Sequence, residues 1–396
     1  MKMKILIICS VYKPNVGGVE KSIEELSTYY RQHGHEVVVL TKRFPFSLDD
    51  YEIIDSLQVY RIDRPKQNDD YFKFKKWLDV NEKNIKADIV HVIGIRRPMS
   101  LIALILSKLW KVPLITTFCG GDIGEENDKI AKQVWEEGKD TNINSIYQSD
   151  YFSAYSKGII EEALKKLPKL KNKIDCIYSS IDFQELKISP IKSTIPYITT
   201  VRRLTHSKGI DILIRAFNII KNDFPDLRLK IVGDGEEKEN LITLSKQLGI
   251  YHKIDFLGFL SIKDVYNLIS QALIHICPSR SEGGGTINIE ASACGCAVIG
   301  SNVEGIPEYI KNNETGLLFK NEDCQDLADK IKIILNDEKL RKNFIQNGID
   351  FSKQFDINII GKKYIEIYEK IVKDYKYRPF EEWSDLTKTI KEIFRL

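Results

Sequence analysis

The chain has 396 residues, of which 43% are hydrophobic and 29% are charged, so it can bury sizeable cores and lacks the composition of a disordered protein. This length favours two domains. Its 59 basic and 56 acidic residues give a net charge of +3. That balance argues against a nucleic-acid partner, but it leaves room for a local basic patch facing an anionic ligand or a lipid surface.

The N-terminal residues lead directly into an apolar run with no small-residue cleavage site, so we expect a first strand rather than a secretory signal. The longest apolar stretch, Leu101–Trp110, is too short to span a bilayer. The seven cysteines show no metal-type spacing, which predicts buried free thiols in a reducing compartment and no metal site. These features together predict a cytoplasmic protein.

The first half of the chain predicts a parallel sheet with helical crossovers. Lys4–Cys9 is a continuous apolar run, as a strand covered on both faces requires. A helix is predicted over Val19–His33 and a second strand over Glu36–Leu40. Further strands are predicted at Ile89–Ile93, Leu114–Phe118, Tyr151–Ala154 and Lys173–Tyr178, with helices between them.

A second series of alternating elements follows a segment with two prolines, Ile188–Pro196, which we interpret as a linker. Strands are predicted at Tyr197–Val201, Leu227–Val232, Ile254–Phe256, Leu273–Cys277 and Ala297–Gly300. The sequence therefore predicts an α/β protein of two Rossmann-like domains, residues 1–187 and 188–372. A C-terminal segment, residues 373–396, is expected to be helical and to pack back on the first domain. Two such domains facing one another would form a ligand cleft at the carboxyl ends of their sheets.

The segment Glu282-Gly-Gly-Gly285-Thr286-Ile-Asn-Ile-Glu290 links a predicted strand to a predicted helix. Glycines at such a turn let backbone N–H groups approach a ligand, and a helix N-terminus favours an anion such as a diphosphate. The two carboxylates are suited to hydrogen bonds from sugar or ribose hydroxyl groups. On this segment alone, a ligand site and a plain turn are equally well supported.

Two arginines followed by a lysine end another predicted strand and strengthen the ligand interpretation. Arg202 and Arg203 follow the strand directly, and Lys208 precedes a glycine at the start of the next helix. Cations that converge at the carboxyl end of a strand match a diphosphate leaving group. Each charge-assisted hydrogen bond contributes about 1.5–3 kcal/mol, against about 0.3–1 kcal/mol for a helix dipole.

Two glycine-containing turns in the first domain are also candidate ligand contacts. Gly17 and Gly18 lie in the first β-α turn, which is not a G-x-G-x-x-G dinucleotide fingerprint. Cys119 and Asp122 bracket a second pair of glycines at the end of a later strand. On this evidence alone the first turn is about as consistent with an empty turn as with a ligand contact.

Taken together, these segments resemble glycosyltransferase family 4, whose members have the GT-B fold of two facing Rossmann-like domains. The resemblance spans roughly residues 4 to 320, and its motifs are specific as a set. The segments that carry it are Gly17-Gly18-Val19-Glu20, Arg203-Leu204-x3-Lys208-Gly209, Val232-Gly233-Asp234-Gly235, Glu282-x7-Glu290, Ala291-x3-Gly295, Gly305-Ile-Pro307-Glu308 and Thr315-Gly316-Leu317-Leu318.

The resemblance implies that a sugar moves from a UDP- or GDP-linked donor to a hydroxyl acceptor, with retention at the anomeric carbon. It implies no metal and no cofactor apart from the nucleotide sugar as co-substrate. The first domain would bind the acceptor, which could be a sugar, a lipid-linked glycan or a small molecule, and the second domain would bind the donor. Peripheral membrane contact and the oligomeric state stay open.

The resemblance also assigns roles to residues of this chain. Arg203 and Lys208 would hold the diphosphate and stabilise the charge that develops as it leaves. Glu290 would bind the ribose hydroxyls, and Glu282 the hydroxyls of the donor sugar. Asp122 and Cys119 would lie near the reacting sugar. The remaining predicted donor contacts are Gly17 and Gly18, Gly233 and Gly235 at the base, and Gly284, Gly285 and Thr286 at the phosphates.

Three positions depart from the family pattern. Cys119 stands where a histidine is usual, so its role and the identity of the donor sugar are open. Ser179 or Ser180 stands where an asparagine is common. Arg202 replaces the glycine that usually precedes Arg203, which adds a positive charge near the predicted phosphates.

Two other classes of function remain as alternatives. A nucleotide-sugar epimerase or hydrolase could use the same fold, and a nucleotide-sugar-binding module without catalysis would also explain the motifs. An NAD-dependent oxidoreductase is disfavoured because the dinucleotide fingerprint is missing. The aromatic and lysine residues of Tyr71–Leu78 could touch a membrane or a glycan, but their spacing favours an ordinary helix.

Overall fold

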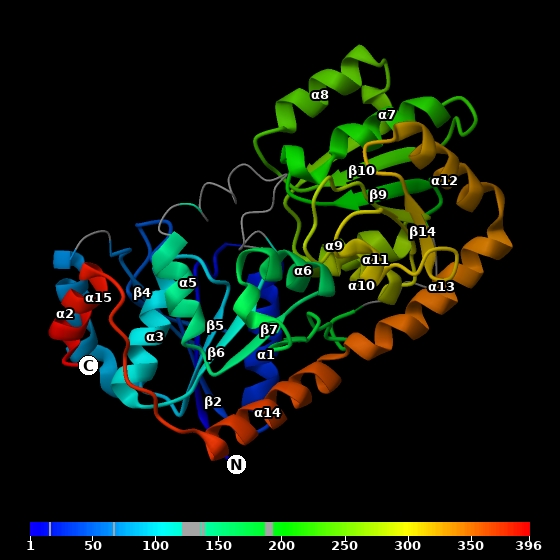
Figure 1. Ribbon diagram of the computed structural model, residues 1–396. Helices are drawn as coiled ribbons and strands as arrows, with labels where there is room; N and C mark the ends of the chain where they lie inside the picture. The colour runs from blue at the N-terminus through cyan, green and yellow to red at the C-terminus, as the bar shows by residue number, and fades with distance from the viewer. Residues whose placement is uncertain (16, 66–67, 121–135, 137–138, 187–192) are drawn as a thin grey trace. The chain divides into compact units, whose positions relative to one another are not determined.

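The computed structural model describes residues 1–15, 17–65, 68–120, 136, 139–186 and 193–396. The chain forms two compact units (Figure 1). Unit 1 comprises Met1–Ser180 together with Ile357–Leu396, and unit 2 comprises Ile181–Asp356. None of the described helices has both the length and the apolar character needed to cross a bilayer.

Unit 1 is built on an eight-stranded sheet in the order β3-β4-β2-β1-β5-β6-β7-β8, in which only the edge pair β3 and β4 is antiparallel among the described strands. The strands are β1 (Lys4–Cys9), β2 (Glu36–Lys42), β3 (Tyr51–Ile54), β4 (Leu57–Ile62), β5 (Ile89–Ile93), β6 (Leu114–Phe118), β7 (Tyr151–Ala154) and β8 (Ile174–Cys176). The six strands predicted in the first half of the chain are confirmed within a few residues, while β3 and β4 were not predicted.

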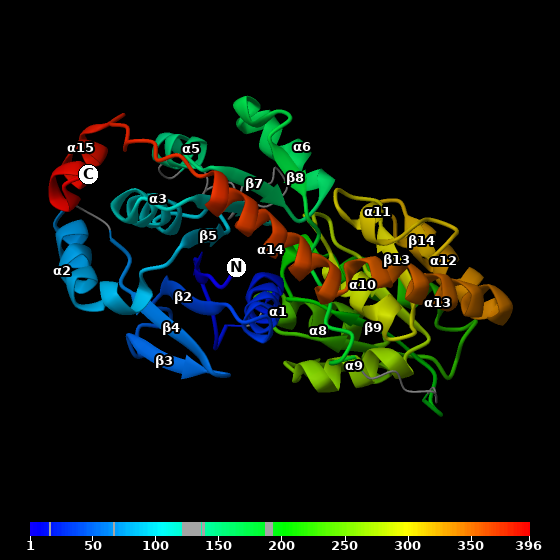
Figure 2. The same ribbon diagram turned by 90° about the horizontal axis from the view of Figure 1, so that it is seen from below.

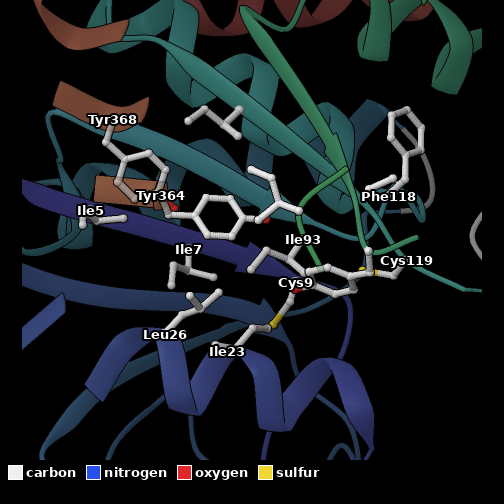
Figure 3. Close-up of a cluster of buried hydrophobic side chains, with 14 of the residues drawn as sticks. Ile5, Ile7, Cys9, Ile23, Leu26, Ile93, Phe118, Cys119, Tyr364 and Tyr368 are labelled. Atoms are coloured by element: carbon white, nitrogen blue, oxygen red, sulfur yellow. The ribbon is translucent and has the colours of Figure 1, made fainter. Parts of the chain in front are cut away.

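Helices cover both faces of this sheet, so its central strands are apolar on both sides, whereas the edge strands β3 and β8 are largely exposed or only partly buried. Their bounds are α1 (Gly18–Gln32), α2 (Asn68–Ile85), α3 (Met99–Trp110), α5 (Lys139–Tyr147), α6 (Lys157–Lys166), α14 (Ile357–Asp374) and α15 (Asp385–Phe394). Strand β1 illustrates the arrangement, because successive side chains point to opposite faces. Ile5, Ile7 and Cys9 join the core under α1 and α14 (Figure 3), whereas Leu6 and Ile8 join the core under α2, α3 and α15.

The C-terminal helices belong to unit 1. Helix α14 packs against α1, and α15 packs against α2 (Figure 2). Tyr364 and Tyr368 of α14 are fully buried, and the Tyr368 hydroxyl lies 2.5 Å from the imidazole Nδ1 of His91 on β5. Unit 2 therefore ends at Asp356 rather than at residue 372, because the apolar face of α14 is buried in the core of unit 1.

Unit 2 has a six-stranded parallel sheet in the order β11-β10-β9-β12-β13-β14. Its strands are β9 (Tyr197–Val201), β10 (Arg228–Val232), β11 (Ile254–Gly258), β12 (Ile274–Cys277), β13 (Ala297–Ser301) and β14 (Gly316–Phe319). Its helices are α7 (Ile210–Ile220), α8 (Lys238–Gln247), α9 (Ile262–Gln271), α10 (Thr286–Ala293), α11 (Ile306–Tyr309), α12 (Cys324–Asn336) and α13 (Glu338–Ser352). The order reverses between β9 and β12, as in doubly wound nucleotide-binding folds.

Candidate functional site

The predicted phosphate-binding residues of unit 2 gather where its strand order reverses. Arg202 directly follows β9, and Lys208 lies at the end of the loop that leads into α7. Glu282 lies in the loop between β12 and α10. Because β9 and β12 are adjacent parallel strands, their carboxyl ends meet at the same edge of the sheet. Open α/β sheets bind ligands at this position.

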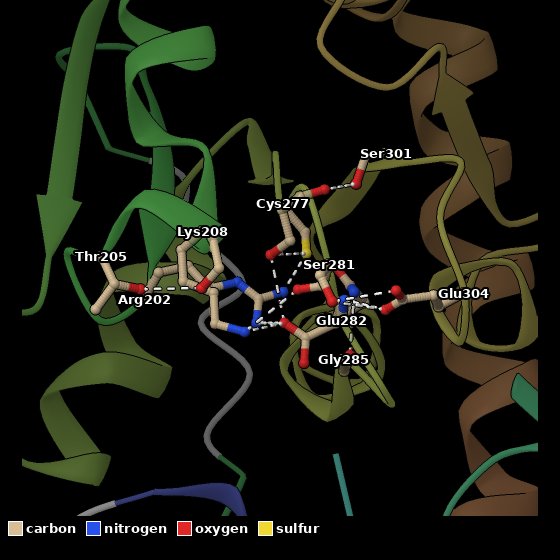
Figure 4. A network of polar contacts seen from close by, with 12 residues as sticks. Arg202, Thr205, Lys208, Cys277, Ser281, Glu282, Gly285, Ser301 and Glu304 are labelled. Carbon is tan, nitrogen blue, oxygen red and sulfur yellow. Dashed lines mark hydrogen bonds and ion pairs between the residues drawn. The ribbon is translucent and has the colours of Figure 1, made fainter. Parts of the chain in front are cut away.

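Glu282 is held between two cations (Figure 4). Its Oε2 atom accepts hydrogen bonds from Arg202 Nη1 at 2.6 Å, from Lys208 Nζ at 3.1 Å and from Ser279 Oγ at 3.3 Å. The side chains of Arg202 and Glu282 are 8% and 14% exposed. Burial would raise the pKa of Glu282, but the positive charges of Lys208 and Arg202 outweigh that effect and lower the pKa to about 2. Glu282 is thus a carboxylate at every physiological pH.

Arg202 was predicted to be one of the cations that converge on a diphosphate and an added charge relative to the family pattern; in the structure it is a central member of this network, paired with Glu282. Its guanidinium also contacts the Cys277 thiol at the end of β12. Arg203, by contrast, has an exposed side chain, and no carboxylate in the described part of the chain pairs with it. Lys208 and Arg203 therefore lie on the same loop in different electrostatic states. Lys208 is neutralised by Glu282. The exposed guanidinium of Arg203 is available to bind an anion.

Two further ionic contacts hold the loops of the site in place. Arg280 donates from Nη1 and Nη2 to the two carboxylate oxygens of Asp211, each at 2.8 Å, and so ties the loop after β12 to the start of α7. Glu304 accepts hydrogen bonds from the backbone N–H of Glu282 at 2.6 Å and from Ser281 Oγ at 3.0 Å. Local sequence patterns do not reveal these pairs, because each partner lies more than twenty residues from the group that it contacts.

Close backbone approaches require several of the predicted glycines. Gly209 has a φ of 63°, and a Cβ atom at this position would lie 2.0 Å from the carbonyl oxygen of Pro278. Gly233 has a φ of 126°, and its Cβ would lie 1.8 Å from the carbonyl oxygen of Arg202. The backbone N–H of Arg202 in turn donates to Val232 O at 2.9 Å. These glycines therefore fix the path of the loop that carries Arg202 and Lys208.

Helix α10 follows the triple glycine and carries the second predicted carboxylate. Gly285 is its N-cap with a φ of 81°, a conformation that favours glycine, and Gly284 and Thr286 flank it. No side chain caps this end of the helix, so its first backbone N–H groups are suited to an anion. Glu290 is 5% exposed, and the hydroxyl of Tyr266 on α9 donates to its Oε1 atom at 3.4 Å.

The predicted residues of unit 1 lie at the carboxyl edge of its own sheet. Gly17 and Gly18 precede and begin α1, and Gly17 has an extended backbone with a φ of −173°. Cys119 follows β6, but its side chain is only 2% exposed and lies in the apolar core beside α14 (Figure 3). Asp122 lies outside the described residues. The described residues contain no group of three or more His, Cys, Asp or Glu that could hold a metal ion.

Two family models match the chain in succession. The model described as Glycosyltransferase Family 4 matches residues 16–185, and the model described as Glycosyl transferases group 1 matches residues 182–351. The N-acetyl-alpha-D-glucosaminyl L-malate synthase of Bacillus anthracis is 27% identical over 95% of this chain and 99% of its own length. An alpha-1,3-N-acetylgalactosaminyltransferase of Campylobacter jejuni, which acts on N,N'-diacetylbacillosaminyl-diphospho-undecaprenol by name, is 29% identical over 59% of this chain and 65% of its length.

The solved structures give the fold. The HepE protein of Anabaena in complex with UDP-glucose superimposes with a TM-score of 0.75 at 19% identity and covers 93% of this chain and 100% of that chain. This likeness confirms the predicted fold class, an α/β protein with two Rossmann-like domains of the GT-B type.

Proposed function

The chain belongs to glycosyltransferase family 4, and we propose that it transfers a sugar from a UDP- or GDP-linked donor to an acceptor hydroxyl, with retention at the anomeric carbon and without a bound metal. Glycosyl transfer itself follows from the family. The observation that best supports this donor class is the set of cations around Glu282 at the point in unit 2 where the strand order reverses.

The diphosphate of the donor is the natural partner for the cations of the β9–α7 loop. Arg203 is exposed and unpaired by any described carboxylate, and Lys208 Nζ can share its protons between Glu282 and a phosphate oxygen. The uncapped N-terminus of α10, at Gly284–Thr286, adds backbone donors to the phosphates. As the glycosidic bond breaks, negative charge grows on the leaving phosphate, and these donors stabilise that charge. Because they are already in position, they do so without the reorganisation that water molecules would need.

The two carboxylates serve the hydroxyl groups of the donor. Glu290 is buried beside Tyr266 and would accept hydrogen bonds from the two ribose hydroxyls. Glu282 is an acceptor whose pKa is too low for it to protonate a leaving group, so it would orient the donor sugar rather than act as an acid. Retention follows in this proposal from attack on the face that the diphosphate leaves, with the leaving phosphate taking the acceptor proton.

The remaining predicted contacts keep their proposed roles with one refinement. Gly17 and Gly18 would contact the donor phosphates from the first domain, and Asp122 would lie near the reacting sugar. Gly233 and Gly235 would border the base, but their close approach to the β9–α7 loop supports a structural role as well. Cys119 would shape the site only indirectly, since its thiol is buried.

We propose that the acceptor is a hydroxyl-bearing molecule, either a sugar, a lipid-linked glycan or a small molecule. One relative is named for a product with L-malate and another for a diphospho-undecaprenol acceptor, so both kinds of acceptor occur among similar proteins. None of the seven cysteines forms a disulfide bond, which supports a reducing compartment such as the cytoplasm. Contact with a membrane surface would follow only from a lipid-linked acceptor.

A panel of UDP- and GDP-sugars, each offered with a range of acceptors, tests this proposal. We expect one donor to yield a glycoside whose anomeric proton signal in NMR has the configuration of the donor, with the same rate in the presence of EDTA. Release of free sugar alone would favour a hydrolase. Donor binding without turnover would favour a binding module, and an absolute need for a divalent ion would contradict the metal-independent mechanism.

A further inference from the structure

Glu282 makes all of its side-chain hydrogen bonds through one of its two carboxylate oxygens. Arg202, Lys208 and Ser279 all donate to Oε2 (Figure 4). In the described part of the chain, no donor forms a hydrogen bond with Oε1. The side chain is 14% exposed, and Oε1 is not one of the polar atoms that are buried without a partner. One oxygen of this carboxylate is therefore occupied, and the other is open to a ligand.

The backbone of Glu282 is fixed as well. Its N–H donates to the carboxylate of Glu304 at 2.6 Å, and its carbonyl oxygen accepts from the N–H of Gly305 at 3.1 Å. A Cβ atom at Gly305 would lie 2.4 Å from the carbonyl oxygen of Gly283, so the loop after β13 packs directly against the triple-glycine loop. Every hydrogen-bonding atom of Glu282 except Oε1 thus has a partner among the described residues.

Arg202 is held at both ends of its side chain. Its backbone N–H donates to Val232 O at 2.9 Å, and Gly233 packs against its carbonyl oxygen. At the other end, Nη1 donates to Glu282 Oε2 at 2.6 Å and Nη2 contacts the Cys277 thiol at the end of β12. The donors of a guanidinium form a rigid planar fork. Nη1 therefore cannot leave Glu282 unless Nη2 also moves away from Cys277.

The other two donors to Oε2 hold the carboxylate less firmly. Lys208 Nζ lies 3.1 Å away at the end of a flexible side chain, and in the proposed function it also serves the diphosphate. Ser279 Oγ is a neutral donor at 3.3 Å, whereas hydrogen bonds from a charged donor are about twice as strong as neutral ones. Arg202 is therefore the partner that keeps the carboxylate in place when a donor is bound.

We propose that Arg202 is a positioning residue for the selection of the donor sugar. It holds Glu282 by Oε2, so that Oε1 alone faces the sugar and accepts a hydrogen bond from one hydroxyl or amide N–H group. The inference rests on the proposed function, because it assigns the donor sugar to Glu282. A carboxylate that could turn would meet the hydroxyl groups of several epimers with either oxygen. A fixed oxygen selects one epimer, since a donor with its hydroxyl elsewhere leaves this acceptor unpaired.

Calorimetric titration of the full chain with pairs of epimeric donors tests this inference without an acceptor. The pairs are UDP-glucose with UDP-galactose, UDP-N-acetylglucosamine with UDP-N-acetylgalactosamine, and GDP-mannose with GDP-glucose. The members of each pair differ in the configuration of one carbon. Each Kd is divided by the Kd of free UDP or GDP, so that effects on the nucleotide alone cancel.

The test variants act on the two ends of the guanidinium. Arg202→Met removes the guanidinium and keeps an unbranched side chain. Cys277→Ala leaves the charge of Arg202 but removes the partner of Nη2, and Cys277→Ser restores an acceptor for it. Arg215→Met is the matched control, because it removes one positive charge from an exposed position on α7.

We expect the wild-type protein and Arg215→Met to bind one epimer at least about tenfold more tightly than the other, as the loss of a hydrogen bond to a charged acceptor implies. In Arg202→Met this ratio should fall to within about threefold. Cys277→Ala should lower the ratio in part, and Cys277→Ser should restore it. A merely structural defect would weaken the nucleotide and both epimers alike, and it would leave the ratio unchanged.

Failure of this inference is distinct from failure of the proposed function. If donors bind but the wild-type protein shows no epimer preference, or if Arg202→Met keeps the wild-type ratio, Arg202 does not position Glu282 for the sugar. If Arg202→Met does not fold, equal ratios in Cys277→Ala and Cys277→Ser would overturn the inference in its place. A wild-type protein that binds neither UDP nor GDP would refute the donor assignment itself, and this inference with it.

Discussion

Replacing Glu282 by glutamine separates the two electrostatic roles that we propose for this residue, neutralising Lys208 and accepting hydrogen bonds from the donor sugar. The substitution keeps the shape and one hydrogen-bond acceptor but removes the charge that neutralises Lys208, whose Nζ lies 3.1 Å from Glu282 Oε2. A diphosphate oxygen that contacts Lys208 from its other side would lie about 6 Å from Glu282. At an effective dielectric constant of about 20, the repulsion between the two anions is about 3 kcal/mol.

Solvent and counter-ions reduce this repulsion in a partly open site, and about 1.4 kcal/mol corresponds to a tenfold change in affinity. We therefore expect Glu282→Gln to bind UDP or GDP about tenfold more tightly than the wild-type protein in calorimetric titration. Transfer should nevertheless fall, because the sugar hydroxyls lose their carboxylate partner. Glu314→Gln is the control, since it removes the same charge from an exposed position in unit 2.

The same substitution should destabilise the free protein. The difference between the ordinary pKa of 4.5 and the lowered pKa of about 2 corresponds to about 3 kcal/mol of stability at pH 7. The unfolded chain takes up this proton near pH 4.5 and the folded chain only near pH 2, so the contribution is lost as pH falls through that interval. The deficit of Glu282→Gln should thus shrink to less than about half at pH 3. Weaker or unchanged nucleotide binding, with an unchanged melting temperature at pH 7, would refute this reasoning.

Three further predictions concern Glu290, Gly209 and Cys119. Glu290→Ala should abolish detectable transfer while circular dichroism and the melting temperature stay near wild type; near-normal turnover would remove it from the site. Gly209→Ala should lower the melting temperature of unit 2 by about 4–8 °C, because its Cβ would meet the carbonyl oxygen of Pro278 at 2.0 Å, and scanning calorimetry measures this shift. Cys119→Ala should retain transfer within a few-fold, because the thiol is buried; loss of turnover in a folded protein would instead assign it a direct role.

The sequence predicts most of this fold because the central strands of both sheets are covered on both faces. The apolar run Lys4–Cys9 and the β-branched run Tyr197–Val201 stand out clearly, and both strands have the predicted bounds. The edge pair β3 and β4 is harder to find. Tyr51–Ile54 is mostly exposed, so it has no apolar run, and its place in the sheet depends on antiparallel pairing with β4.

The C-terminal boundary could not be predicted for a different reason. The apolar stripe of α14 predicts that one face of this helix is buried, but it does not indicate which of the two units covers that face. The unit that covers α14 is determined by contacts between residues several hundred positions apart, such as the hydrogen bond of 3.2 Å between the hydroxyl groups of Tyr30 and Tyr368. Periodicity in sequence carries no information about contacts of that separation.

The residues of the candidate site in unit 2 could be singled out from the sequence where they belong to local motifs; their role in donor binding stays a prediction. Lys208, Glu282 and Glu290 were singled out from their spacing, and the structure brings Lys208 and Glu282 into contact. Arg280 and Glu304 were missed, because an isolated arginine or glutamate in a loop resembles any solvated charge.

The central claim is that the cations of the β9–α7 loop bind a nucleotide diphosphate. A thermal-shift panel of UDP, GDP and their sugars with the wild-type protein and with Lys208→Ala tests it most directly, since a ligand of the native state raises its melting point. We expect one nucleotide series to raise the melting temperature of the wild-type protein and this shift to be largely lost in Lys208→Ala. Equal shifts in both proteins, or no shift with any nucleotide, would contradict it.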